Sequence, residues 1–71
     1  METTMTLRQH RMAQGMTIRE LAKAAEVSTQ TVVSIEKGRP ARMQSYRKLA
    51  SALGISLMDI REFTQMVMAE P

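Results

Sequence analysis

The middle of the chain, residues 17–38, reads TIRELAKAAEVSTQTVVSIEKG. It begins with Thr17 and Glu20, which have the Thr-x-x-Glu spacing of a capping box. In such a box each side chain bonds the backbone amide of the other residue, and a helix starts there. The spacing therefore predicts a helix over residues 18–24, whose inward-facing side chains are expected to be Leu21, Ala22 and Ala25.

A second helix is predicted after a tight turn at residues 25–27. Ser28 is a favourable N-cap, and residues 29–37 lead up to Gly38, a residue type that commonly ends helices. Two short helices joined by a three-residue turn cross steeply and leave the start of the second one projecting. That geometry allows a helix to enter the major groove of DNA. The inward residues of this helix are expected to be Val32 and Ile35.

Helical periodicity continues on both sides of this pair, and strand signals are nearly absent. Residues 7–14 predict a first helix that ends at Gly15, and residues 43–53 predict a fourth helix that ends at Gly54. Ser56 is expected to cap a fifth helix with one apolar stripe, formed by Leu57, Ile60, Phe63 and Val67. We therefore expect a single all-α domain over residues 1–71, a compact five-helix bundle with residues 61–71 as an extension of its last helix.

Composition excludes several classes of protein. The chain has 71 residues, no cysteine and one histidine, His10, so it offers neither a disulfide nor a zinc cage. It also lacks a set of nucleophile, base and orienting group, so we expect no enzyme activity, no metal and no cofactor. No apolar run approaches the roughly 20 residues of a membrane span, which favours a cytoplasmic protein.

The methionines at positions 12, 16 and 43 are expected to lie in the core. The flexible side chains of Met12, Met16 and Met43 suit the filling of irregular gaps there.

Several motifs in order resemble the lambda-repressor/Cro-type (XRE-type) helix-turn-helix family. They are TIRELA at 17–22, VS at 27–28, VVSIEKG at 32–38 and LASALGISL at 49–57. The resemblance covers about residues 7–60 and implies a five-helix lambda-repressor-like fold that binds DNA. It also implies a host among bacteria, phages and mobile elements.

The resemblance implies a role for particular residues. An ion pair is expected between Arg11 and Glu36. Contacts to base edges fall on the outer side of the second motif helix, at Thr29, Gln30, Val33 and Ser34. Contacts to DNA phosphates fall on Thr17, Arg19, Lys37, Arg39 and Arg42. The residue types agree, because glutamine pairs with adenine and the methyl groups of Thr31 or Val33 suit a thymine methyl.

The charge pattern supports the same interface. The formal net charge is +3, and residues 37–58 hold five basic residues and no acidic one. The alternative is that the polar helix face and the basic residues form ordinary solvent-exposed surface and bind nothing.

Some positions depart from the family pattern. They are Ile18 in place of glutamine, Glu26 in place of glycine, His10 in place of an aliphatic residue, and Ala41 and Arg42 at the start of the fourth helix.

The apolar end of the chain suggests a partner. Ile60, Phe63, Met66 and Val67 are expected to form a homodimer interface, and the alternative is that this segment folds back over the core. A two-fold dimer would read a pseudo-palindromic operator. The sequence thus predicts a sequence-specific regulator of double-stranded DNA, by default a repressor. The alternative function is an antitoxin, or another interaction module, whose fold binds a toxin or a different partner protein as well as DNA.

Overall fold

The computed structural model describes residues 4–68 and confirms the all-α class. Its helices are α1 (Leu7–Ala13), α2 (Ile18–Ala25), α3 (Thr29–Glu36), α4 (Met43–Leu53) and α5 (Arg61–Met68), with a turn of 3-10 helix, η1 (Leu57–Asp59), before α5. The first four helices agree with the sequence prediction to within a residue at each end. Within residues 4–68 the extended structure is limited to one parallel bridge between Met5 and Ile60.

Local side-chain caps explain where these helices begin. The predicted box at α2 is present, because the Thr17 amide donates to Glu20 Oε1 at 2.8 Å and the Glu20 amide donates to Thr17 Oγ1 at 3.1 Å. Ser28 Oγ accepts from the Thr31 amide at 3.1 Å and starts α3. A second capping box, between Thr6 and Gln9, starts α1. This box was not predicted, although its Thr-x-x-Gln spacing is visible in the sequence.

The turn between α2 and α3 depends on one left-handed residue. Glu26 ends α2 with φ 59° and ψ 44°, and it is the only non-glycine residue with positive φ among residues 4–68. Its amide donates to the carbonyl of Lys23 at 3.2 Å, and the Val27 amide donates to that of Ala22 at 3.0 Å. These bonds reverse the direction of the chain within a few residues, so that α3 crosses α2.

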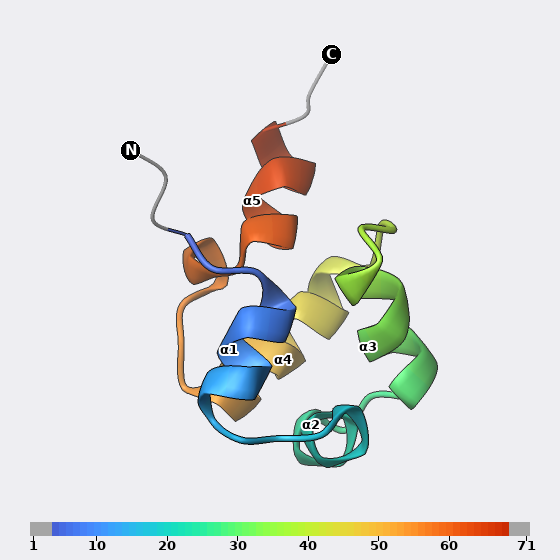
Figure 1. Ribbon diagram of the computed structural model, residues 1–71. Helices are drawn as coiled ribbons and strands as arrows, with labels where there is room; N and C mark the ends of the chain where they lie inside the picture. The colour runs from blue at the N-terminus through green and yellow to red at the C-terminus, as the bar shows by residue number, and fades with distance from the viewer. Residues whose placement is uncertain (1–3, 69–71) are drawn as a thin grey trace.

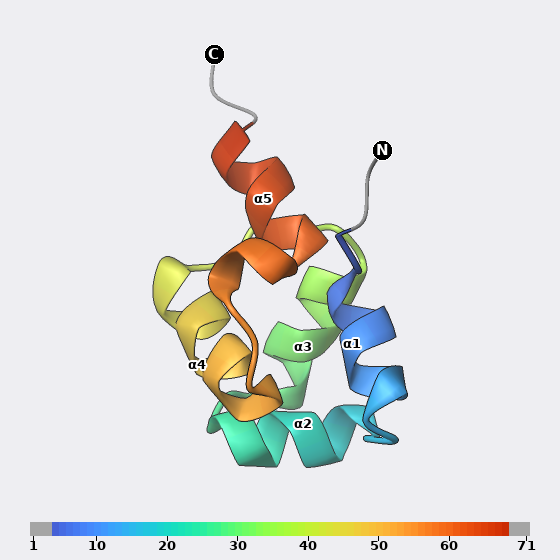
Figure 2. The ribbon, with the colours of Figure 1, turned by 90° about the vertical axis from the view of Figure 1, so that its left-hand side faces the viewer.

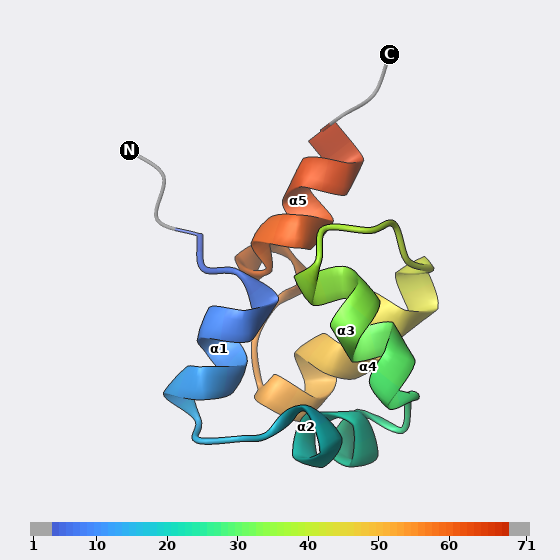
Figure 3. The same ribbon diagram turned by 45° about the vertical axis from the view of Figure 1, so that its right-hand side comes forward.

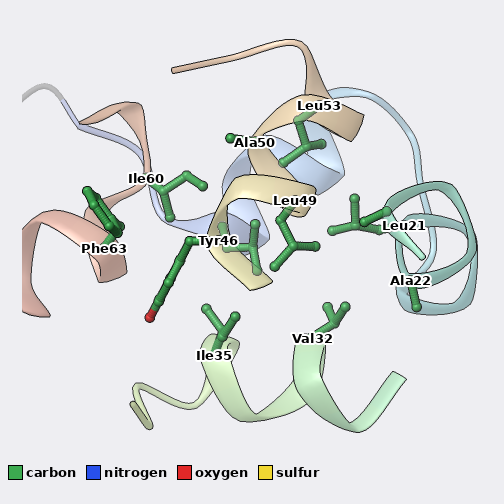
Figure 4. Close-up of a cluster of buried hydrophobic side chains, with 12 residues drawn as sticks. Leu21, Ala22, Val32, Ile35, Tyr46, Leu49, Ala50, Leu53, Ile60 and Phe63 are labelled. Carbon is green, nitrogen blue, oxygen red and sulfur yellow. The ribbon is translucent and has the colours of Figure 1, made fainter. Parts of the chain in front are cut away.

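The helices surround a single core. α2 packs against both α3 and α4, and α1 packs against α3. α2 and α5 lie at opposite ends of the molecule (Figure 1 and Figure 2), and α3 lies on the outer side of α4 (Figure 3). Figure 4 shows the side chains that meet between them. Those buried almost completely include Leu7, Leu21, Val32, Ile35, Tyr46, Leu49 and Ile60.

The predicted fifth helix is wrong in its first part. Ser56 caps η1 rather than a continuous helix, and Ile60 then adopts an extended conformation with φ −97° and ψ 116°. The cause lies at the other end of the chain, because the Arg61 amide donates to the Met5 carbonyl at 2.9 Å. Ile60 is fully buried beside this bridge. The helix therefore restarts at Arg61.

Further contacts join the first helix and the residues before it to η1 and the start of α5. The Leu7 amide donates to Glu62 Oε1 at 2.8 Å, and Arg61 Nη2 donates to the Thr4 carbonyl at 2.6 Å. His10 Nε2 bonds the Asp59 carbonyl at 2.7 Å. His10 is half-buried and makes a structural contact of its own, at a position that is often aliphatic in the family.

Two of the three methionines expected in the core are on the surface. Met12 is 58% exposed and Met43 is 43% exposed, whereas Met16 packs against the core as predicted. Met12 stands in the last turn of α1 and Met43 is the first residue of α4. Both side chains therefore lie at the surface instead of filling a gap in the core.

Candidate nucleic-acid interface

The inner side of α3 anchors it to the rest of the fold. Val32 and Ile35 are fully buried. Because successive residues of a helix are turned by about 100°, Gln30 lies on the opposite side and faces outward. Thr29 and Gln30 are exposed, and Val33 and Ser34 are half-buried. All four predicted base-contact residues therefore reach the surface of α3, two of them exposed and two half-buried. α3 itself lies on the outer side of the fold (Figure 3).

An ion pair fixes the far end of α3. Arg11 Nε donates to Glu36 Oε2 at 2.8 Å and Arg11 Nη2 donates to Glu36 Oε1 at 3.2 Å. The side chains are only 11% and 10% exposed. The hydrogen bond to Glu36 raises the pKa of Arg11 above its ordinary value, although burial acts in the opposite direction. Both residues are thus in place as predicted, and they join α1 to α3.

One hollow beside α3 combines polar and basic groups. This α3–α4 hollow has a volume of about 260 Å³ and is lined by Ser28, Gln30, Thr31, Ser34, Pro40, Ala41, Arg42 and Ser45. It brings Gln30 and Ser34, which are suited to base edges, next to Arg42, which is suited to a phosphate. The Thr31 hydroxyl lies 3.0 Å from Ser28 Oγ, so it belongs to the cap of α3.

The beginning of α4 lies at one edge of this hollow, which Arg42 and Ser45 line. Arg42 occupies the N-cap position and makes no side-chain cap bond. Within the described part of the chain, the amides of Met43 and Gln44 have no backbone partner outside the helix. Unpaired amides at a helix N-terminus attract anions. Ser45, in the same turn, is a lining residue that the sequence analysis missed; its signal was a short polar residue in the first turn of a predicted helix.

A second hollow lies on the other side of α3. This α1–α3 hollow has a volume of about 320 Å³ and is lined by Arg8, Arg11, Ile18, Val33, Glu36 and Lys37. It brings the predicted phosphate residue Lys37 next to Val33. Arg8 and Ile18 were not predicted as contacts. They come from α1 and from the first position of α2.

The remaining predicted phosphate residues are spread more widely. Arg39 is exposed, but it lines a hollow with Tyr46 and Glu62, on the side of the loop that faces α5. Thr17 uses its hydroxyl to cap α2, and Arg19 is exposed in the same first turn. Arg42 and Lys37 are therefore the predicted basic residues that share a hollow with base-contact residues. Arg39 meets that group through its backbone, since its amide donates to the Ser34 carbonyl at 3.0 Å.

The predicted dimer residues fall into two groups. Ile60 is fully buried and Phe63 is 5% exposed. The ring of Phe63 meets that of Tyr46 edge to face, with centroids 5.4 Å apart (Figure 4). These two side chains fold back into the core, so a second copy would meet only Met66, which is half-buried, and Val67, which is 42% exposed.

Burial also affects the chemistry of Tyr46. Its side chain is almost fully enclosed. Desolvation raises the pKa of the Tyr46 hydroxyl, and the negative charge of Glu62 acts in the same direction. The neutral phenol is therefore the form that this core accommodates.

The family comparison agrees with this geometry. A family model described as Helix-turn-helix matches residues 7–60, most of the chain. No curated protein and no solved structure matches significantly. No helix among residues 4–68 is long and apolar enough to cross a membrane. The matched range contains the α2–α3 unit and both members of the Arg11–Glu36 ion pair. The chain belongs to the lambda-repressor/Cro-type (XRE-type) helix-turn-helix family and is a DNA-binding regulator.

Proposed function

We propose that the protein is a sequence-specific regulator that reads double-stranded DNA by inserting α3 into the major groove. The observation that carries this proposal is the α3–α4 hollow. There Gln30 and Ser34, which are able to bond base edges, lie beside Arg42 and the start of α4, which are able to bond a phosphate. Phosphate contacts fix the register of a protein on the duplex, and base contacts select the sequence.

The shape of α3 suits this role. A major groove about 12 Å wide admits one α-helix with its side chains. α3 lies on the outer side of the fold. Its outward residues are short and uncharged apart from the longer Gln30, and the cation Lys37 follows directly after the helix. Glutamine makes two hydrogen bonds to the N6 and N7 positions of adenine when its helix is correctly placed. We therefore assign base readout to Thr29, Gln30, Val33 and Ser34.

We further propose a two-fold dimer that acts as a repressor. The exposed side chain of Val67 and the half-buried Met66 lie on α5, at the end of the molecule remote from α2. A two-fold pair would present its two α3 helices to half-sites one helical turn apart, about 34 Å. Repression needs only occupancy of a promoter, which such a pair supplies without a further contact.

Selection from a randomised library of duplex DNA tests the proposal. The purified full chain is mixed with the library at about 150 mM salt, and bound duplexes are amplified over several rounds. We expect one enriched motif with an inverted repeat, bound at least about 10³-fold more tightly than a shuffled duplex. Retention of DNA without any enriched motif would contradict sequence-specific reading. An enriched motif without two-fold symmetry would contradict the dimer alone.

A further inference from the structure

A third hollow lies between the loop after α3 and helix α5, and none of the proposed base-reading residues lines it. This loop–α5 hollow has a volume of about 230 Å³. Its lining includes Arg39 and Pro40 from the loop, Tyr46 from α4, and Glu62 and Met66 from α5. Pockets for drug-sized ligands measure about 300–1,000 Å³, so an occupant of this hollow has the size of a small metabolite.

The hydroxyl of Tyr46 is a polar group that the fold leaves without a partner. Tyr46 is 1% exposed, and the hydroxyl end of its ring points away from Leu49 and Ile60 (Figure 4). Within residues 4–68 this hydroxyl makes no hydrogen bond. Buried polar groups are normally hydrogen-bonded, and a phenol both donates and accepts. The hydroxyl is therefore available to an occupant of the loop–α5 hollow.

Two opposite charges line the same hollow without pairing with each other. Arg39 is exposed, and among residues 4–68 its side chain forms no ion pair with Glu62. Glu62 uses Oε1 to accept from the Leu7 amide at 2.8 Å, which leaves Oε2 for another donor. The hollow thus offers a guanidinium to a carboxylate and a carboxylate oxygen to an ammonium group.

The charge of Glu62 acts close to the Tyr46 hydroxyl. Burial first, and then the charge of Glu62, raises the pKa of Tyr46. An anion beside the hydroxyl would be repelled by this charge, whereas an ammonium group would be attracted. The negative group of an occupant then falls to Arg39, and Pro40 and Met66 supply apolar surface for the remainder. The occupant that fits carries an ammonium group, a carboxylate and a short apolar side chain.

We propose that the loop–α5 hollow is a binding site for a free amino acid. Arg39 binds its carboxylate, and Glu62 and the Tyr46 hydroxyl bind its ammonium group. An Arg39 that is held in this way is withdrawn from the DNA backbone, so the amino acid weakens the binding of DNA. This second step rests on the proposed reading of DNA and on the predicted phosphate contact of Arg39, whereas the binding of the amino acid depends on neither.

Nuclear magnetic resonance of the ¹⁵N-labelled full chain tests the site without DNA. The probes are the standard L-amino acids, each added at up to about 10 mM. We expect an amino acid with a short apolar side chain to shift the amide signals of Gly38, Arg39 and Met66 saturably and to leave those of α2 unchanged. Saturable shifts with none of the amino acids would overturn the proposal.

Two analogues of the bound amino acid test the need for both charges. Its amide lacks the carboxylate, and its N-acetyl derivative lacks the ammonium group. Each is expected to bind about tenfold more weakly, because each loses a hydrogen bond between charged groups. An analogue that binds as tightly as the amino acid would overturn the assignment of its missing group.

Matched protein variants test the two residues that are assigned to the ammonium group. Glu62→Gln keeps an acceptor for the Leu7 amide and removes the charge, and Tyr46→Phe keeps the ring and removes the hydroxyl. We expect binding of the amino acid to weaken about tenfold in Glu62→Gln and about fivefold in Tyr46→Phe. Glu26→Gln makes the same charge change in a different hollow, between α2 and α4, and should bind as the wild type does.

The ¹⁵N spectra show whether each variant is folded. Unchanged affinity in Glu62→Gln, or an equal loss in Glu26→Gln, would overturn the site.

The effect on DNA is measured separately, by fluorescence anisotropy with the duplex enriched from the randomised library. A saturating concentration of the amino acid should weaken binding and reduce the salt slope by about one unit, the contribution of one phosphate contact. In Glu62→Gln the same addition should have a smaller effect. Unchanged DNA affinity with the amino acid bound would overturn the coupling to DNA and leave the amino-acid site intact. If selection enriches no motif, the proposed function fails, and the resonance titration still decides the site.

Discussion

Arg11 and Glu36 join the first helix to the end of the third through two hydrogen bonds, Nε–Oε2 at 2.8 Å and Nη2–Oε1 at 3.2 Å. Arg11 Nη1 also donates to the Met16 carbonyl at 2.8 Å, so one guanidinium holds α3 and the loop before α2. Since α3 carries the proposed base-reading residues, this pair sets the orientation in which they meet DNA.

Removing Arg11 should destabilise the fold substantially. Arg11→Ala leaves the Glu36 carboxylate 10% exposed and without its partner. Because the pair is not fully buried, we expect a loss of about 2–4 kcal/mol in the free energy of unfolding, measured by urea denaturation. Arg8→Ala is the control, since Arg8 is exposed on the same helix and should cost less than about 0.5 kcal/mol. Equal losses in the two variants would show that the ion pair adds no more to the free energy of unfolding than an exposed arginine does.

A glycine at position 26 should stabilise the protein. Glu26 has φ 59°, a left-handed conformation that costs a non-glycine residue roughly 1 kcal/mol. Glu26→Gly is expected to raise the free energy of unfolding by about 0.5 kcal/mol, because greater freedom of the unfolded chain offsets part of the relief. Glu26→Ala keeps the strain and should bring no gain. A stabilising alanine would mean that the Glu26 side chain, rather than its backbone, is unfavourable.

The buried tyrosine should make the fold sensitive to alkali. Burial raises the pKa of Tyr46 above its ordinary value of 10.0. Below about pH 10 the phenol is protonated in both states and its stabilising packing is fully present. As the pH rises further, the unfolded chain loses the proton first, so the free energy of unfolding falls.

Tyr46→Phe isolates this effect because it keeps the ring that packs against Phe63 and removes the ionisable group. Denaturation of both proteins between about pH 8 and about pH 11 should show the wild type losing stability relative to the variant above about pH 10. Parallel pH profiles would indicate that the Tyr46 hydroxyl ionises as freely in the folded protein as in the unfolded chain.

A charge on α5 should separate the proposed dimer. Val67 is 42% exposed and lies on the helix remote from α2. We expect the wild type to be a dimer at micromolar concentration and Val67→Asp to be a monomer, as measured by sedimentation equilibrium. The thermal melting temperature of the individual protomer should change little. Met12→Asp, at a side chain 58% exposed on α1, is the control and should remain dimeric. A wild type with the mass of one chain would refute the dimer directly.

The features that were predicted correctly from local patterns depend on neighbouring residues. Thr17 and Glu20 are three residues apart and make their capping box within one turn of helix. The ion pair of Arg11 with Glu36 spans 25 positions, and it was predicted from the family resemblance rather than from a local pattern.

The features that sequence reasoning missed depend on distant contacts or on ambiguous side chains. The break at Ile60 follows from its bridge to Met5, which no helical periodicity reveals. Phe63 has the spacing of an exposed apolar stripe, yet it lies against Tyr46 in the core. Methionine is flexible enough to suit core or surface, so the sequence did not reveal that Met12 is exposed.

The most direct test of sequence reading by α3 compares Gln30→Ala with Arg42→Ala on two duplexes. One duplex is the enriched motif and the other a shuffled copy, and anisotropy titrations are run from about 50 to about 200 mM salt. Gln30→Ala should weaken binding to the motif by about 1–3 kcal/mol and leave binding to the shuffled duplex nearly unchanged. Arg42→Ala should weaken both and reduce the salt slope by about one unit. Equal losses on the two duplexes for Gln30→Ala would contradict the assignment of α3 as the reading helix.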